Sequence, residues 1–159
     1  KCPEISFYRD SRPNLFALYG LAGKLEEALL KRVWLKSGGY LVIEPTEALT
    51  VIDVNTGKYD GSKNVEETFA LINREAAQET ARQIRLRNLS GIIMVDFIDM
   101  NQEESKMQLM EALKAAVAKD PVKTVVVEMT RLNLVEITRK KVRRPLYEQA
   151  AGLYNSTRE

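Results

Sequence analysis

Apolar and polar positions follow two different periods along this chain, and the changes of period divide it into elements. Around Leu21–Val33, apolar side chains recur at helical spacing, which predicts an amphipathic helix. Two β-branched runs, Tyr40–Glu44 and Ala48–Val54, flank Pro45-Thr46-Glu47 and predict a hairpin. A short strand is also expected at Ile5–Tyr8.

The second half of the chain continues with alternating helices and strands. Asn64-Val65-Glu66-Glu67 predicts the start of a helix that ends near Arg87, and Asn101-Gln102-Glu103-Glu104 predicts another that ends near Lys119. The remaining elements expected are strands at Gly91–Val95, Val122–Met129 and Leu134–Thr138, and a final helix at Pro145–Tyr154. This order predicts an α/β (α+β) fold with a mixed sheet and flanking helices.

Two of the predicted strands end in a carboxylate, at Asp53 and at Asp96. Strands of one sheet can bring such ends to one edge, where two carboxylates about 4 Å apart repel by about 4 kcal/mol at an effective dielectric of about 20. A divalent cation would convert this repulsion into attraction. The two acids are therefore candidate ligands for Mg²⁺, with Mn²⁺ as a substitute, and Asn55 shares a strand face with Asp53. On spacing alone, the alternative that these acids only cap turns or helices stays open.

The composition narrows the chemistry available to the chain. Its 159 residues, 45% of them hydrophobic, suit one domain with a core. The absence of histidine excludes imidazole catalysis in this chain, so catalysis would rest on carboxylates, Lys, Tyr or an oxygen-bound metal. A single cysteine, Cys2, excludes an internal disulfide and fits a reducing cytoplasm; zinc is not expected. We also expect no membrane span, because no apolar run is long enough.

Basic residues are unevenly placed, although the formal net charge is only +2. The segment 131–144 carries six Arg and Lys residues against the single acid Glu136, a pattern that favours polyanions. Solvated helix faces and pairing with Glu75 and Glu79 are the alternatives that stay open. The candidate RNA contacts are Lys58, Arg82, Arg85, Arg87, Arg131, Arg139, Lys140 and Arg143.

Taken together, several motifs resemble the ribonuclease E/G family. They are Leu49–Gly57, Glu66–Thr68, Ala81–Arg87, Val95–Met100 and Leu134–Arg139, and they occur in the family's order. The resemblance implies a cytoplasmic endoribonuclease that cuts AU-rich single-stranded RNA with Mg²⁺, leaves a 5′-phosphate and a 3′-hydroxyl, and acts in RNA processing, including rRNA processing.

Position by position, the resemblance assigns roles to three residues. Asp53 and Asp96 match the family's metal-ligating aspartates, and Asn55 matches the asparagine that supports them. These three are the predicted catalytic residues, whereas Asp99 is interpreted as a structural acid. The chain departs from the family's usual residues at Asn88, Ser90 and Asn133, which replace Asp, Gly and Gly.

The resemblance also implies a domain organisation. Residues 1–36 would be the end of an RNase H-like subdomain with a connecting helix, and 37–159 a DNase I-like catalytic subdomain. The family's RNA-binding S1 domain and 5′-end sensor are expected before Lys1, and its Cys-x-x-Cys zinc link beyond Glu159. We therefore expect a fragment that folds alone, carries the metal site and cleaves RNA weakly or not at all, and a full-length protein that can form a homo-oligomer.

Two other functions stay open on the residues alone. The chain could be a non-catalytic RNA-binding or assembly module, in which basic side chains contact phosphates and the acids are structural. It could also be a phosphoesterase that acts on DNA or on a small phosphate ester.

Overall fold

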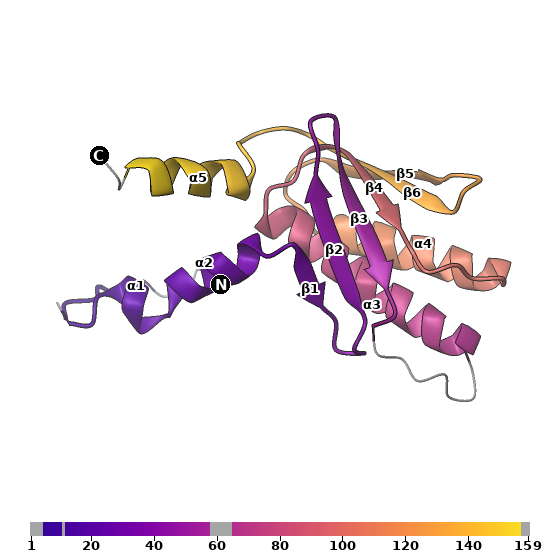
Figure 1. Cartoon of the computed structure of the whole chain (residues 1–159), viewed down its shortest axis with the longest axis horizontal. Coiled ribbons are helices and arrows are strands. Elements are labelled where there is room, and N and C mark those ends of the chain that lie inside the picture. Colours follow the sequence, from indigo (N-terminus) through magenta and orange to yellow (C-terminus); the bar gives the residue numbers. More distant parts are fainter. Residues whose placement is uncertain (1–4, 11, 58–64, 157–159) are drawn as a thin grey trace. The chain divides into compact units, whose positions relative to one another are not determined.

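A computed structural model of the chain describes residues 5–10, 12–57 and 65–156, with side chains described as far as Ala151 (Figure 1). It divides into two compact units, Lys1–Leu30 and Lys31–Glu159. The first unit contains two short helices, α1 (Leu15–Leu18) and α2 (Leu21–Leu29). Asn14 caps α1, since its Oδ1 accepts a hydrogen bond from Ala17 N at 2.8 Å.

The second unit is built on a six-stranded mixed sheet with the strand order β1-β2-β3-β4-β6-β5. Strands β3 and β4 are parallel, and every other neighbouring pair is antiparallel. The strands are β1 (Arg32–Trp34), β2 (Tyr40–Pro45), β3 (Leu49–Asn55), β4 (Gly91–Asp96), β5 (Thr124–Met129) and β6 (Leu134–Arg139). The helices of this unit are α3 (Val65–Leu86), α4 (Glu103–Val117) and α5 (Leu146–Ser156). The predicted mixed sheet with flanking helices is confirmed.

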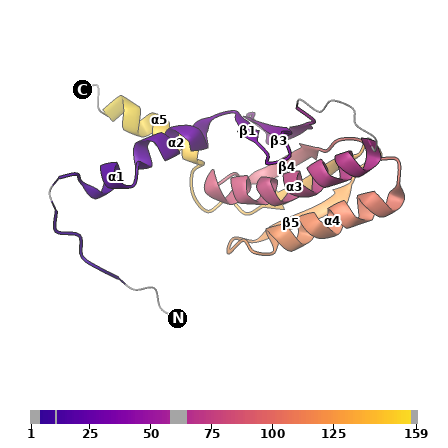
Figure 2. The same ribbon diagram turned by 90° about the horizontal axis from the view of Figure 1, so that it is seen from below.

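Helices α3 and α4 pack against one face of this sheet (Figure 2). Helix α3 connects β3 to β4 and so provides the crossover that two parallel strands require. Side chains that point to the helices are buried, as at Ile52 and Val95, both 0% exposed. The opposite face stays partly open, because Val51 is 37% and Ile92 50% exposed. This open face carries the side chains at the ends of β3 and β4.

Three local predictions need correction. Ile5–Tyr8 forms no strand: Ile5 and Phe7 are exposed, and no described strand pairs with them. The helix predicted over Leu21–Val33 ends at Leu29, because Val33 belongs to β1, where it pairs with Leu41 and packs against the core. Helix α4 begins after Gln102 rather than after Asn101. The predicted cap Asn64 lies outside the described residues. None of the described helices has the length and apolar character needed to cross a bilayer.

Candidate active site

Strand register places Asp53 and Asp96 side by side. They are direct partners in the parallel pairing of β3 with β4, whose strands lie about 4.8 Å apart. Their neighbours Ile52 and Val95 are buried on the helix-covered face, so the alternation of a strand directs both carboxylates to the open face. The two acids predicted from separate strand ends thus come together at one edge of one sheet.

Asn55 supports this pair through Asp53. Its Nδ2 donates a hydrogen bond to Asp53 Oδ2 at 2.7 Å, as the two-residue spacing along one strand allows. This bond fixes the rotamer of the carboxylate and uses one of its oxygens. The other oxygen, Oδ1, accepts no hydrogen bond from any described residue, and it is the atom available to a ligand.

Electrostatics around Asp96 are unfavourable for its charged form. Partial burial raises the pKa of Asp96 above its usual value, and the negative charges of Asp53 and Asp99 raise it further. Within the described ranges, no Lys or Arg forms an ion pair with Asp53 or Asp96. Among the described residues, the pair is therefore a concentration of negative charge without a basic partner at the end of two strands.

These side chains fit a hard divalent cation that keeps most of its ligands for water and substrate. Mg²⁺ binds through one or two carboxylates together with phosphate oxygens, and the site offers two carboxylates. The part of the chain that the structure describes contains no group of three or more His, Cys, Asp or Glu side chains that could hold a metal. The donor set is thus sparse and consists of oxygen atoms only.

A buried amide that the sequence prediction missed holds the loop after Asp96. Asn73 on α3 is 0% exposed; its Nδ2 donates to Ile98 O at 2.7 Å and its Oδ1 accepts from Ile98 N at 3.0 Å. Phe97 and Met100 are buried on either side of Ile98. A signal was available in the sequence, because Asn73 follows Ile72 on the apolar stripe of a long helix, where an unpaired amide would be costly.

Two glycine positions allow close packing of the turns beside Asn55. Gly57 has φ +67°, and a Cβ built there would lie 2.0 Å from Gly38 O. A Cβ at Gly39 would lie 2.9 Å from Asn55 O. Only glycine fits at such contacts, so the turn before β2 lies directly against the end of β3. Glu75 holds this turn from α3 by accepting hydrogen bonds from Lys36 N and Ser37 N at 2.8 and 2.9 Å.

The predicted RNA contacts do not form one surface. Arg131 precedes β6, at the end where Leu134 pairs with Asp96, whereas Lys140 and Arg143 follow the opposite end of that strand. All three are exposed. Lys58 lies outside the described residues.

The other basic candidates interact within the fold. Arg82 pairs with Glu79 at 2.7 Å, and Arg85 Nη1 donates to Ala116 O at 3.3 Å. Arg87 is 7% exposed and donates to Gln83 Oε1 at 2.7 Å. The prediction that Arg87 and Arg139 contact RNA does not fit the structure, because both are buried.

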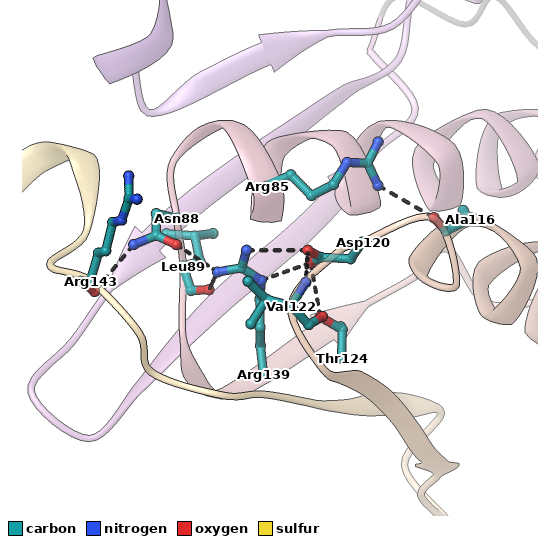
Figure 3. Close-up of polar contacts among 9 residues, drawn as sticks. All are labelled: Arg85, Asn88, Leu89, Ala116, Asp120, Val122, Thr124, Arg139 and Arg143. Carbon is teal, nitrogen blue, oxygen red and sulfur yellow. Dashed lines mark hydrogen bonds and ion pairs between the residues drawn. The ribbon is translucent and has the colours of Figure 1, made fainter. Parts of the chain in front are cut away.

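Arg139 instead forms a buried network at the start of β4 (Figure 3). Its Nε donates to Asp120 Oδ2 at 2.7 Å, and the two side chains are 3% and 2% exposed. Its Nη1 donates to Asn88 Oδ1 at 2.8 Å and to Leu89 O at 3.0 Å. Arg139, at the end of β6, therefore connects the segment between α3 and β4 with the loop after α4.

Comparisons with known proteins agree with this arrangement of motifs. The model of the Ribonuclease E/G family matches residues 1–142. The chain is 48% identical over 132 residues to ribonuclease G of Escherichia coli K12, a match that covers 83% of this chain and 27% of that protein. It is 47% identical over 148 residues to ribonuclease G of Haemophilus influenzae, covering 91% and 30%.

A ribonuclease E is similar to a comparable degree. The protein from Nostoc sp. PCC 7120 is 46% identical over 144 residues, covering 91% of this chain and 21% of that protein. The chain thus spans less than a third of the length of these curated relatives.

Proposed function

Because the chain belongs to the ribonuclease E/G family, we propose that it carries the metal site of an endoribonuclease that hydrolyses phosphodiester bonds in single-stranded RNA. The observation that carries this proposal is the pairing of Asp53 with Asp96 across β3 and β4. Two neighbouring carboxylates without a basic partner in the described ranges repel each other and destabilise the fold. A bound metal ion would offset this repulsion.

In this proposal Asp53 and Asp96 hold Mg²⁺, or Mn²⁺ in its place, and Asn55 positions Asp53. When bound, the ion supplies neutralisation of charge on the scissile phosphate and lowers the pKa of water. The hydrogen bond from Asn55 Nδ2 keeps the Asp53 carboxylate in one rotamer. The hydrogen bonds of Asn73 to Ile98 keep the residues after Asp96 in place, so both ligands would be held on rigid elements.

The contacts described here give less support to a purely RNA-binding module. Such a module needs basic side chains gathered along one path for a polyanion. Arg87 and Arg139 are buried, and Arg131 lies at the end of β6 opposite to Lys140 and Arg143. The pair of acids, by contrast, lies together on an open sheet face.

The test uses a full-length protein that contains this chain. Asp53→Asn and Asp96→Asn should each reduce Mg²⁺-dependent turnover of a single-stranded RNA by more than about 100-fold, whereas Asn55→Ala should cost about 10- to 100-fold, as is typical of residues that orient metal ligands. Glu128→Gln, an exposed acid on β5, is the matched control and should retain activity. Circular dichroism checks that each variant folds, and cleavage retained by both aspartate variants would refute the proposal.

A second test compares RNA turnover by this chain alone with turnover by the full-length protein. Holding a flexible strand in line for attack needs binding energy from groups remote from the scissile bond, and the curated relatives are more than three times as long as the matched region. We expect this chain alone to turn over the same RNA far more slowly than the full-length protein at equal Mg²⁺. Equal rates would show that the chain alone positions its substrate.

A further inference from the structure

A cluster of one cation and two aromatic rings lies at the β1 edge of the sheet. The rings of Trp34 and Tyr40 have centroids 5.1 Å apart and planes inclined at 60°. The guanidinium carbon of Arg32 lies 4.6 Å from the Tyr40 centroid and 5.8 Å from the Trp34 centroid. These distances are those of a cation stacked against aromatic faces.

This cluster shares a sheet face with the two acids. Arg32 pairs with Val42, which pairs with Asp53, which pairs with Asp96, so one row of side chains crosses four strands. Residues paired across neighbouring strands point to the same face. In the adjoining row, Trp34 pairs with Tyr40 and Tyr40 with Asn55. The rings therefore begin immediately beside Asn55, and Arg32 is two strand spacings, about 10 Å, from Asp53.

Packing of the core does not rely on Arg32 or Trp34, which are both exposed. Val33 in β1 and Leu35 just after it alternate with these two residues and supply the core contacts of this segment. Trp34 is 57% exposed. Arg32 makes no ion pair with a carboxylate in the described ranges. A large exposed indole with a stacked guanidinium is a combination typical of surfaces that bind single-stranded nucleic acid.

We propose that Arg32, Trp34 and Tyr40 form a stacking platform for a nucleobase of the RNA, next to the phosphodiester held at Asp53 and Asp96. The identity of the ligand as RNA rests on the proposed function. The base stacks on the exposed indole, and Arg32 offers its remaining N–H groups to a phosphate of the same strand. The platform supplies positive charge on a face whose centre is acidic, so it would hold the strand where the acids alone would repel it.

The sole tryptophan of the chain makes the platform directly observable. A short single-stranded oligoribonucleotide, added at low salt to this chain in Ca²⁺-free and Mg²⁺-free buffer, should quench the emission of Trp34 saturably. Inorganic polyphosphate of matched charge should not quench it, because it has no base to stack. Absence of quenching by the oligoribonucleotide, or equal quenching by polyphosphate, would overturn the proposal.

Substitutions in the platform test which of its side chains contribute to oligoribonucleotide binding. Tyr40→Ala should weaken oligoribonucleotide binding, measured by the same quenching, by roughly 5- to 100-fold, and Tyr40→Phe should preserve it, as expected for stacking. Arg32→Gln, which leaves both rings in place, should also weaken binding and should flatten its dependence on salt. The control is Tyr147→Ala, which removes an exposed aromatic side chain from α5, outside the platform. Unchanged affinity in both Tyr40→Ala and Arg32→Gln would overturn the platform.

Two further measurements separate this inference from its alternatives. The double variant Asp53→Asn with Asp96→Asn should lose cleavage, measured in the full-length protein, and should keep the quenching, measured in this chain. Loss of quenching in this variant would overturn the platform, whereas retained cleavage would refute the metal site and not the platform. A Trp34 emission shift that depends on protein concentration without RNA would show that a second copy covers this face. That outcome would also overturn the proposal.

Discussion

Two acids near opposite ends of β4 have opposite surroundings. Asp96, at the end of this strand, is exposed beside Asp53 and Asp99, and its pKa is raised. The side chain of Asp120 is 2% exposed and lies against Arg139, which pairs with Gly91 at the start of the same strand. Burial alone would raise the pKa of Asp120, but hydrogen bonds from Arg139, Val122 N and Thr124 together lower it.

These different surroundings indicate different roles within a single sheet: Asp120 contributes to stability, whereas Asp96 is a candidate for function. Around Asp120, each charge has a partner, and the network joins three segments of the chain. Around Asp96, no Lys or Arg of the described residues forms an ion pair that would offset the repulsion from Asp53 and Asp99. An acid whose charged form is destabilised by its surroundings is a better candidate for ligand binding than an acid whose oxygens already accept hydrogen bonds within the fold.

The largest expected effect follows from breaking the stabilising end. Arg139→Met leaves Asp120 buried without its cation, which should lower the free energy of unfolding by about 3–5 kcal/mol. Urea denaturation followed by circular dichroism measures this. Arg143→Ala removes an exposed arginine near the same network, while the Arg143 carbonyl keeps its bond from Asn88, and should change stability by less than about 0.5 kcal/mol. Equal losses in the two variants would contradict the distinction.

The next effect concerns how the candidate site is held. Asn73→Leu keeps the size of the side chain but leaves Ile98 N and Ile98 O without their partners, which should cost about 1–3 kcal/mol in unfolding experiments. Gln78→Leu, at an exposed position of the same helix, serves as the control. If both variants unfold at the same urea concentration as the parent chain, the loop after Asp96 is held by other contacts.

Much of the fold was predictable because its signals are local. Alternation and β-branched runs located β2, β3 and β4 to within about two residues, and the spacing of apolar residues located α3. The segment Arg32–Trp34 was missed because three residues carry too little pattern, and its pairing with β2 depends on a turn of the chain. Helix α4 lacks a side-chain cap of its own; instead, Glu66 from α3 accepts from Asn101 N and Gln102 N, which no local pattern reveals.

The candidate site was predictable only in part for the same reason. Strand ends identified Asp53 and Asp96, but charge counts did not distinguish exposed arginines from buried ones: Arg139 fits a basic segment by sequence and an internal ion pair by structure. The departures at Asn88 and Asn133 have a backbone explanation. Their φ values are 50° and 60°, in the left-handed region that asparagine tolerates better than most residues.

A smaller effect appears when the pH is lowered. The pKa of Asp120 is below its unfolded value, so its contribution to stability is present above about pH 4 and is lost as the pH falls through the folded pKa. The parent chain should therefore lose stability in acid more steeply than Arg139→Met, which lacks the lowering interaction. Unfolding free energies measured from pH 7 to about pH 3 test this, and parallel curves would contradict it.

The smallest effect has the opposite sign and concerns Asp96. A carboxyl whose folded pKa is raised contributes stability below its unfolded pKa, and that contribution is lost as the pH rises through the folded pKa. At pH 7 the charged Asp96 is therefore slightly destabilising. Asp96→Asn should raise stability in metal-free buffer by only a few tenths of a kcal/mol, because an exposed side chain is screened by solvent. The gain should disappear in acid, where the parent carboxyl is protonated.

Magnesium should reverse the order of stability of the parent chain and Asp96→Asn. A cation that binds the folded chain through Asp53 and Asp96 stabilises it by mass action, so added Mg²⁺ should raise the Tm of the parent chain. Asp96→Asn removes a ligand and should lose most of that rise. Glu128→Gln, which removes an exposed acid elsewhere, should respond as the parent does. If Mg²⁺ shifts all three proteins equally, the ion acts by general screening, and the crowding of Asp96 beside Asp53 would not reflect a metal site.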